Sequence, residues 1–228
     1  MTNNHESPAV IGTEWDLPDS ETCSLALQLV DDVSPAFLTN HCIRSYLFAR
    51  ELAAAKGMRS DADYVDEVVF LACILHDLGI TDYGSGDQRF EVEGADAAAR
   101  FLRGSGVAED RIATVWQSIA LHTSVGLAER FGTVHSIVMG GISLDVNGIE
   151  KDRLSPGFAE RAHSAFPRQN LGISLADAIA KGTKANPTKA PPFSFPAHVD
   201  QIVNGTPSIS FLDIVGWGDG DVKAVGKP

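Results

Sequence analysis

His76 and Asp77 lie directly after a long apolar run, and a glycine follows two residues later. The run, residues 68–75, has the apolar character of a buried helix. An imidazole nitrogen and a carboxylate oxygen are both common metal ligands, and a helix end holds them at the rim of the core. The partial negative charge of a helix C-terminus also favours a cation. The pair therefore predicts a metal site at the end of a central helix.

Three further groups with the same chemistry flank predicted helices before and after this pair. His41 lies on an upstream helix, His122 ends a downstream one, and Asp145 follows a glycine pair. A divalent metal needs three or four such ligands from different elements. Burying these groups without a metal or other partners would cost free energy. Cys73 lies on the same helix face as His76, but a buried thiol is more often a small hydrophobic residue than a ligand.

Apolar residues recur at three- and four-residue spacing along nearly the whole chain, which predicts helices. No segment alternates as a strand does, so we expect an all-α fold in a single domain. Gly79 is expected to end the central helix in the left-handed conformation, and Gly140-Gly141 to allow close packing of a neighbouring helix. Polar loops are expected at 81–89 and 182–196. The predicted helices span about 34–56, 61–79, 93–103, 108–123, 134–146, 156–166, 174–181 and 196–203.

The chain of 228 residues carries a net charge of −12, which argues against a binder of nucleic-acid phosphates because such a protein needs a basic face. Its apolar runs are too short to span a bilayer, and its polar first residues do not resemble a signal peptide. The three cysteines are expected to be reduced thiols. These features predict a cytoplasmic protein without nucleic-acid or membrane partners.

The order His41, His76-Asp77, Asp145 on a helical scaffold resembles the HD-domain metal-dependent hydrolase superfamily. The resemblance covers roughly residues 35–150. Within it, three segments are similar to the cyanamide hydratase-like branch of that superfamily, namely 75–82, 89–95 and 119–124.

This resemblance implies an HD-domain helical bundle with its core at residues 34–150. Residues 1–33 are then an N-terminal extension with a short helix. Residues 151–228 supply C-terminal helices and a loop that complete the same domain, and both ends of the chain are expected to be flexible.

The resemblance also implies one divalent metal ion, zinc in the first place, with iron or manganese as alternatives. The implied ligands are His41, His76, Asp77 and Asp145. For Asp145 the alternative is a carboxylate that caps or solvates its helix. His122 is implied as the proton-transfer group and Asp77 as the other catalytic residue, and the alternative for His122 is a helix-terminal residue packed on the core edge. A second metal held by His122 and His135 is a further alternative.

Phe90, Glu91 and Thr123 are expected to wall the substrate pocket. Glu91 and Glu93 also suit a helix start, where the dipole stabilises carboxylates, and this structural role is favoured. Arg44, three residues after His41, is the candidate cation for a phosphorylated substrate. A solvated loop is the favoured interpretation of three late lysines, Lys181, Lys184 and Lys189.

The function expected first is that of a hydratase (a lyase), which adds a metal-activated water to a small nitrogenous substrate such as cyanamide or another nitrile. One alternative is an HD phosphohydrolase acting on a nucleotide or small phosphoester. Others are a di-iron oxygenase and a non-catalytic HD binding module. A small-molecule substrate is the expected partner, and the sequence leaves a homo-oligomer open.

Overall fold

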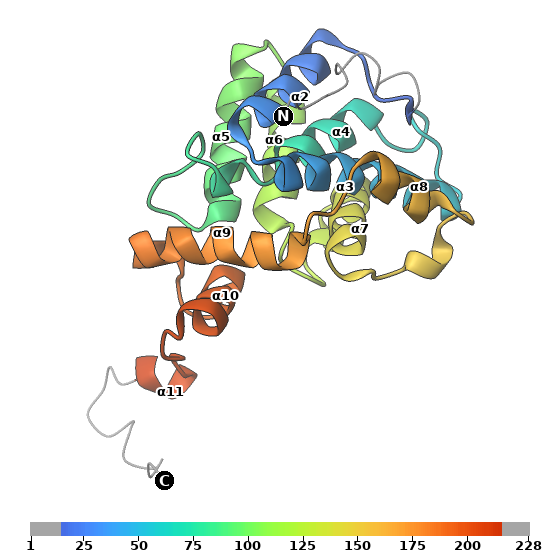
Figure 1. The fold of residues 1–228 in the computed structure, drawn as a ribbon. Helices are drawn as coiled ribbons and strands as arrows, with labels where there is room; N and C mark the ends of the chain where they lie inside the picture. Colours follow the sequence, from blue (N-terminus) through green and yellow to red (C-terminus); the bar gives the residue numbers. More distant parts are fainter. Residues whose placement is uncertain (1–14, 216–228) are drawn as a thin grey trace, which may run out of the picture.

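The computed structural model describes residues 15–215, and within that range every named secondary-structure element is a helix (Figure 1). The expected all-α fold is therefore confirmed. Ser60 and Tyr64 form one isolated bridge. The α-helices are α2 (Glu21–Val33), α3 (Ala36–Ala55), α4 (Asp66–Leu75), α5 (Phe90–Gly104), α6 (Glu109–Leu121), α7 (Thr133–Asn147), α8 (Phe158–Ala165), α9 (Leu171–Ala185), α10 (Phe195–Asn204) and α11 (Phe211–Ile214). Short 3-10 helices are η1 (Leu78–Ile80), η2 (Ala128–Arg130), η3 (Lys151–Arg153) and η4 (Pro187–Lys189).

Helix α4 is the centre of the core. Every residue in it except Glu67 is buried, and it packs against α2, α3, α6 and α7. A helix surrounded on all sides needs apolar residues all round, which is the pattern that predicted its position. Helix α2 lies within residues 1–33, the segment predicted as an N-terminal extension with a short helix, and its buried face belongs to the same core as α4. The flexible ends that the sequence predicts fall on the two termini, and residues 1–14 and 216–228 lie outside the described range.

Helices α3 and α7 approach each other closely at Gly141. A Cβ added there would lie 2.2 Å from the carbonyl oxygen of Ser45 and 2.5 Å from Cβ of Ala49. The expected role of the glycine pair is thus confirmed, with Gly141 making the contact. This close approach brings His41 on α3 next to Asp145 on α7.

Replacing Gly141 with alanine is expected to destabilise the fold by about 1–3 kcal/mol, because the added methyl group overlaps the α3 backbone. Gly140→Ala is the matched control. Its Cβ would make an ordinary contact, 3.6 Å from Cδ1 of Leu52, so better helix propensity should leave stability unchanged or slightly raised. Urea unfolding of both variants measures the difference, and equal effects would contradict the close-packing argument.

Two details of the central helix differ from expectation. The helix begins at Asp66 rather than at 61, because Asp61 is left-handed (φ 57°) and its carboxylate accepts the Asp66 N–H at 3.1 Å. Gly79 is not a left-handed cap, since it lies within η1 without a positive φ. A Cβ there would lie 2.0 Å from the carbonyl oxygen of Phe90, so glycine is required for close packing of η1 on α5.

Helices α9 and α10 cover one end of the bundle, and α10 matches its predicted boundaries to within one residue (Figure 1). Helix α9 extends beyond the predicted 174–181 at both ends, so the predicted loop 182–196 is partly helical. Lys189 is not solvated as expected. It is 6% exposed and forms an ion pair with Glu93 at 2.6 Å. A second apolar cluster joins this cover to the bundle through Leu38, Phe90, Leu171, Leu175, Ile179, Ala180 and Val199.

Among the described residues, no helix combines the length and apolar character needed to cross a membrane.

Candidate metal centre

Three side chains from two helices meet in the buried interior near the end of α4. His41 projects from α3, His76 is the residue after the last turn of α4, and Asp77 follows it. The Nε2 atoms of His41 and His76 are 3.2 Å apart. Oδ2 of Asp77 lies 3.6 Å from Nε2 of His41 and 3.1 Å from Nε2 of His76. A helix end makes this possible, because His76 still has helical backbone angles whereas Asp77 (φ −100°, ψ 13°) leaves the helical path, and both adjacent side chains reach His41.

The hydrogen bonds of the two imidazoles fix which nitrogen faces the cluster without a proton. Nδ1 of His41 lies 2.7 Å from Oδ2 of Asp145, and Nδ1 of His76 lies 2.7 Å from the carbonyl oxygen of Cys73. A carboxylate and a carbonyl only accept hydrogen bonds, so each Nδ1 carries the proton. In the neutral rings both Nε2 atoms therefore present lone pairs to each other. A cation between them would satisfy both, and metal-binding histidines are commonly held in this way.

The carboxylate of Asp77 adds negative charge to the same point. Its Oδ2 atom is buried and has no hydrogen-bond partner. Although burial opposes ionisation, His76 and the other imidazoles hold the pKa of Asp77 well below its usual value. Burial also lowers the pKa of His76, but the charges and hydrogen bonds of Asp77 and Cys42 together outweigh burial and raise that pKa well above its usual value. The cluster therefore needs a positive charge, either a proton on His76 or a bound cation.

These donors fit a divalent metal ion. Two imidazole nitrogens and a carboxylate oxygen, all buried and within 4.8 Å of one another, match the ligand types of zinc and related ions. The Oδ2 atom of Asp77 is the strongest sign, since it is buried without a hydrogen bond and its nearest charged or polar neighbours are the two imidazole nitrogens, and burying a charge without a compensating positive charge is costly. The buried cluster of His41, His76 and Asp77 could thus hold a metal ion.

Asp145, the fourth ligand that the sequence implied, does not join this cluster. Arg44 binds it in bidentate fashion, with Nε 2.7 Å from Oδ1 and Nη2 2.7 Å from Oδ2. The same Oδ2 accepts the proton of His41 Nδ1. Arg168 also lies 3.3 Å from Oδ1. Asp145 therefore orients the metal-facing ring of His41 from behind.

The expectation that Arg44 enters the substrate pocket does not hold either. Its side chain is fully buried, and besides the two bonds to Asp145 it donates to the carbonyl oxygens of Phe166 (2.7 Å) and Pro167 (3.2 Å). Four of the five N–H donors of the guanidinium are engaged in this way, and the side chain is closed off from solvent. Arg44 joins α3, α7 and the end of α8 instead.

A cavity of about 160 Å³ opens above the cluster, with His41, His76, Asp77 and His122 among its lining residues. His122 ends α6, and its Nδ1 donates to the carbonyl oxygen of Ile119 at 2.6 Å. Its Nε2 lies 3.9 Å from Oδ1 of Asp77. Burial lowers the pKa of His122 to about 4, so near neutral pH its Nε2 has a free lone pair beside the cavity. This placement suits the predicted proton-transfer role.

The rest of the cavity wall is mostly apolar and uncharged. Among the described residues that line it, none is a lysine or an arginine. Its neutral polar side chains are Thr123, Ser143 and Asn147, and its apolar ones are Phe90, Val125, Met139, Ile142, Val146, Leu175 and Phe195. Leu175 and Phe195 come from the α9–α10 cover, and the sequence gives no sign that these distant residues reach the site.

Glu91 lies behind the cavity rather than in its wall. It is fully buried, accepts the hydroxyl proton of Thr123 at 2.6 Å and is paired with Arg89. The favoured structural role of Glu91 agrees with this arrangement, which ties the start of α5 to the end of α6 beside His122. Arg89 was missed by the sequence analysis, although an arginine two residues before an acidic helix start was a usable signal.

The remaining candidates lie outside the cluster. His135 is in the first turn of α7, where its Nε2 contacts Oε1 of Gln117 at 3.2 Å, so the structure does not assemble a second site from His122 and His135. Cys73 contributes its carbonyl oxygen rather than its thiol. All three cysteines are free and buried, as expected for reduced thiols.

No protein-family model matches this chain, and no curated protein matches it.

Proposed function

We propose that this protein is a metal-dependent enzyme of the HD type that adds water to a small, uncharged nitrogenous substrate, with cyanamide or another nitrile first among the candidates. The observation that carries the proposal is the set of three buried metal-type donors at the floor of a small cavity without a cationic side chain. The succession of His41, His76 and Asp77 on a helical scaffold supports the HD assignment.

His41, His76 and Asp77 would hold the metal, and their two nitrogens and one oxygen favour zinc, with iron or manganese as alternatives. When bound, such an ion lowers the pKa of a coordinated water molecule toward 7 and so supplies a nucleophile at neutral pH.

The residues of this chain would supply orientation and proton transfer. His122, neutral with its Nε2 toward Asp77, can accept a proton from the attacking water and return it to the substrate nitrogen. Hydrogen bonds to Asp145 and to the carbonyl oxygen of Cys73 fix the orientation and the tautomer of the His41 and His76 rings, respectively. The apolar wall of Phe90, among others, excludes bulk water from the reacting centre.

The direct test is production of urea from cyanamide by purified protein loaded with zinc, iron or manganese. Cyanamide (H₂N–C≡N) plus one water gives urea, so the expected result is stoichiometric urea. Absence of turnover with every metal, at full metal occupancy, would overturn the substrate assignment.

His122→Asn is expected to lower kcat by about 10²–10⁴-fold, the usual contribution of a general acid–base group. Metal content and melting temperature should stay near those of the unchanged protein, because His122 lies outside the three-residue cluster. His135→Asn, also a buried histidine but one that does not line the cavity, is the control and should retain full activity. Equal rates for the two variants would remove His122 from the mechanism.

A phosphohydrolase is the main alternative, and the cavity speaks against it. Phosphoester substrates are anionic, and enzymes that bind them usually provide arginine or lysine side chains. Arg44, the candidate for that role, is turned toward Asp145. Hydrolysis of a phosphoester panel by the manganese- or cobalt-loaded protein would reverse this preference, and a metal-binding protein inactive in both assays would point to a non-catalytic HD module.

A further inference from the structure

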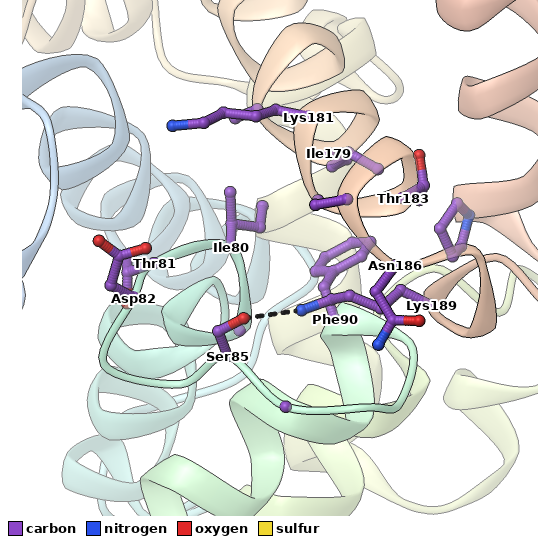
Figure 2. A pocket seen from close by; sticks show the side chains of 16 residues that line it. Ile80, Thr81, Asp82, Ser85, Phe90, Ile179, Lys181, Thr183, Asn186 and Lys189 are labelled. Atoms are coloured by element: carbon purple, nitrogen blue, oxygen red, sulfur yellow. Dashed lines mark hydrogen bonds between the residues drawn. The ribbon is translucent and has the colours of Figure 1, made fainter.

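A second cavity, of about 210 Å³, lies beside the first under the same α9–α10 cover. It is enclosed by the loop after η1 and by α9, as Figure 2 shows with Ser85 on one side and Ile179 on the other. The two cavities lie one after the other along the α9–α10 cover. Leu175 on α9 lines the metal-side cavity, and Ile179, one turn further, lines the second. At the start of α10, Phe195 lines the first and Pro196 the second.

Phe90 lies at the boundary between the two cavities, because it lines both of them. It is 5% exposed, so its ring is enclosed rather than free in solvent. The ring centroid lies 5.6 Å from that of His122 on the metal side and 6.4 Å from that of Phe195 in the cover. The ring is therefore held as a partition between two neighbouring compartments.

The two compartments differ in chemistry. The second one is lined by polar and charged side chains, whereas apolar side chains dominate the first; the polar and charged ones include Thr81, Asp82, Ser85, Lys181, Asn186 and Lys189. Lys189 donates a hydrogen bond to Ser85 at 3.0 Å, drawn as the dashed line in Figure 2. Its charge is neutralised by the ion pair with Glu93. A compartment with hydroxyl and amide groups, a paired ammonium and one further side chain of each charge, Asp82 and Lys181, suits a polar hydrogen-bonding group such as a hydroxyl or an amide.

We infer that Phe90 is the specificity-determining residue of this site: its ring confines ligands of the metal centre to the 160 Å³ compartment, and its removal joins to it a second compartment that takes the polar end of a longer ligand. The inference rests on the proposed metal site but not on cyanamide as the substrate.

Binding of hydroxamic acids to the metal-loaded full-length protein, followed by calorimetry, tests the inference without relying on turnover. Hydroxamates bind metal ions, and their chains can be lengthened stepwise. The unchanged protein is expected to bind acetohydroxamic acid at least tenfold more tightly than 6-hydroxyhexanohydroxamic acid. Phe90→Ala is expected to reverse this order, because each newly buried methylene adds roughly fourfold in affinity. In that variant the 6-hydroxy compound should also bind more tightly than plain hexanohydroxamic acid.

Ile179→Ala is the matched control, because it enlarges the second compartment without removing the partition and should keep the preference for the short ligand. Phe90→Tyr, which keeps a ring at the boundary, should do the same. Metal content and melting temperature verify that each variant is folded. A folded, metal-loaded Phe90→Ala protein with the original length preference would overturn the inference.

The outcomes separate this inference from the proposed reaction. The expected length dependence without cyanamide turnover would support the role of Phe90 and overturn the hydratase assignment alone. Failure of the metal-loaded protein to bind any hydroxamate would overturn the role of Phe90 alone, because the urea assay decides the reaction separately.

Discussion

Asp77→Asn is expected to abolish activity and to weaken metal binding by more than the 10–100-fold that loss of an outer-shell partner typically costs. The substitution removes the charge whose Oδ2 atom is buried without a hydrogen-bond partner between two imidazoles. Elemental analysis of the purified protein gives the metal content, and competition with a chelator gives the affinity. Zinc addition should raise the melting temperature of the unchanged protein far more than that of the variant, since a ligand stabilises only the state that binds it.

Asp32→Asn serves as the control because Asp32 is an exposed aspartate on α2. It alters the net charge by the same amount and should leave metal content and activity unchanged. A wild-type affinity in the Asp77→Asn protein would mean that the metal binds elsewhere.

Asp145→Asn is expected to destabilise the fold by about 3–5 kcal/mol, the usual effect of breaking a buried ion pair on one side. The guanidinium of Arg44 would remain fully buried without its bidentate partner. Glu109→Gln is the control, since Arg103 and Glu109 form the same bidentate pair on the surface, where solvent and salt weaken it. Chemical denaturation should show a large shift of the midpoint for the first variant and little for the second.

The buried pair of Asp145 and Arg44 also predicts how the stability of the fold depends on pH. Burial opposes ionisation of Asp145, but the hydrogen bonds from His41 and Arg44 outweigh it and lower the pKa to about 2 from 3.8. A carboxyl with a depressed pKa in the folded state stabilises fully above its unfolded pKa, and the contribution is lost as the pH falls toward 2. The loss amounts to roughly 2 kcal/mol. Asp145→Asn should flatten the stability curve between pH 4 and 2, and an unaltered curve would contradict the assignment.

The part of the site that could be predicted from the sequence is the part defined by local pattern. An apolar run followed by His76 and Asp77 identifies a buried helix end, and both residues are in the cluster. His41 could be added because it lies beside the apolar stripe of its own helix. These inferences need only helical periodicity, which local side-chain spacing encodes.

The position of Asp145 could not be obtained in this way. Whether a carboxylate faces the metal or the far nitrogen of a metal-facing imidazole depends on how α7 is rotated against α3. That rotation is set by the close contact at Gly141 and by Arg44, which competes for the same carboxylate. Asp145 has the same distance in sequence from His41 and His76 in both arrangements, so the spacing of these residues cannot distinguish them.

Lys189 shows a second limit. A lysine in a segment rich in proline and alanine predicts a solvated loop, and the fold buries it instead beside Glu93 on a distant helix. The extension of α9 to Ala185 brings this segment over the loop after η1, where Ser85 also accepts from Lys189. Pairing between elements far apart in the chain decides such cases, and periodicity within one element carries no record of it.

The far nitrogens of His41, His76 and His122 are all engaged before any ion arrives. Because each tautomer is already chosen, an incoming ion would find its donors preorganised and would have few rotamers left to freeze. Such rigidity should make uptake of the metal ion fast. It should also make the site select among metal ions by radius and preferred coordination geometry, since the rings cannot move outward to accommodate a larger ion.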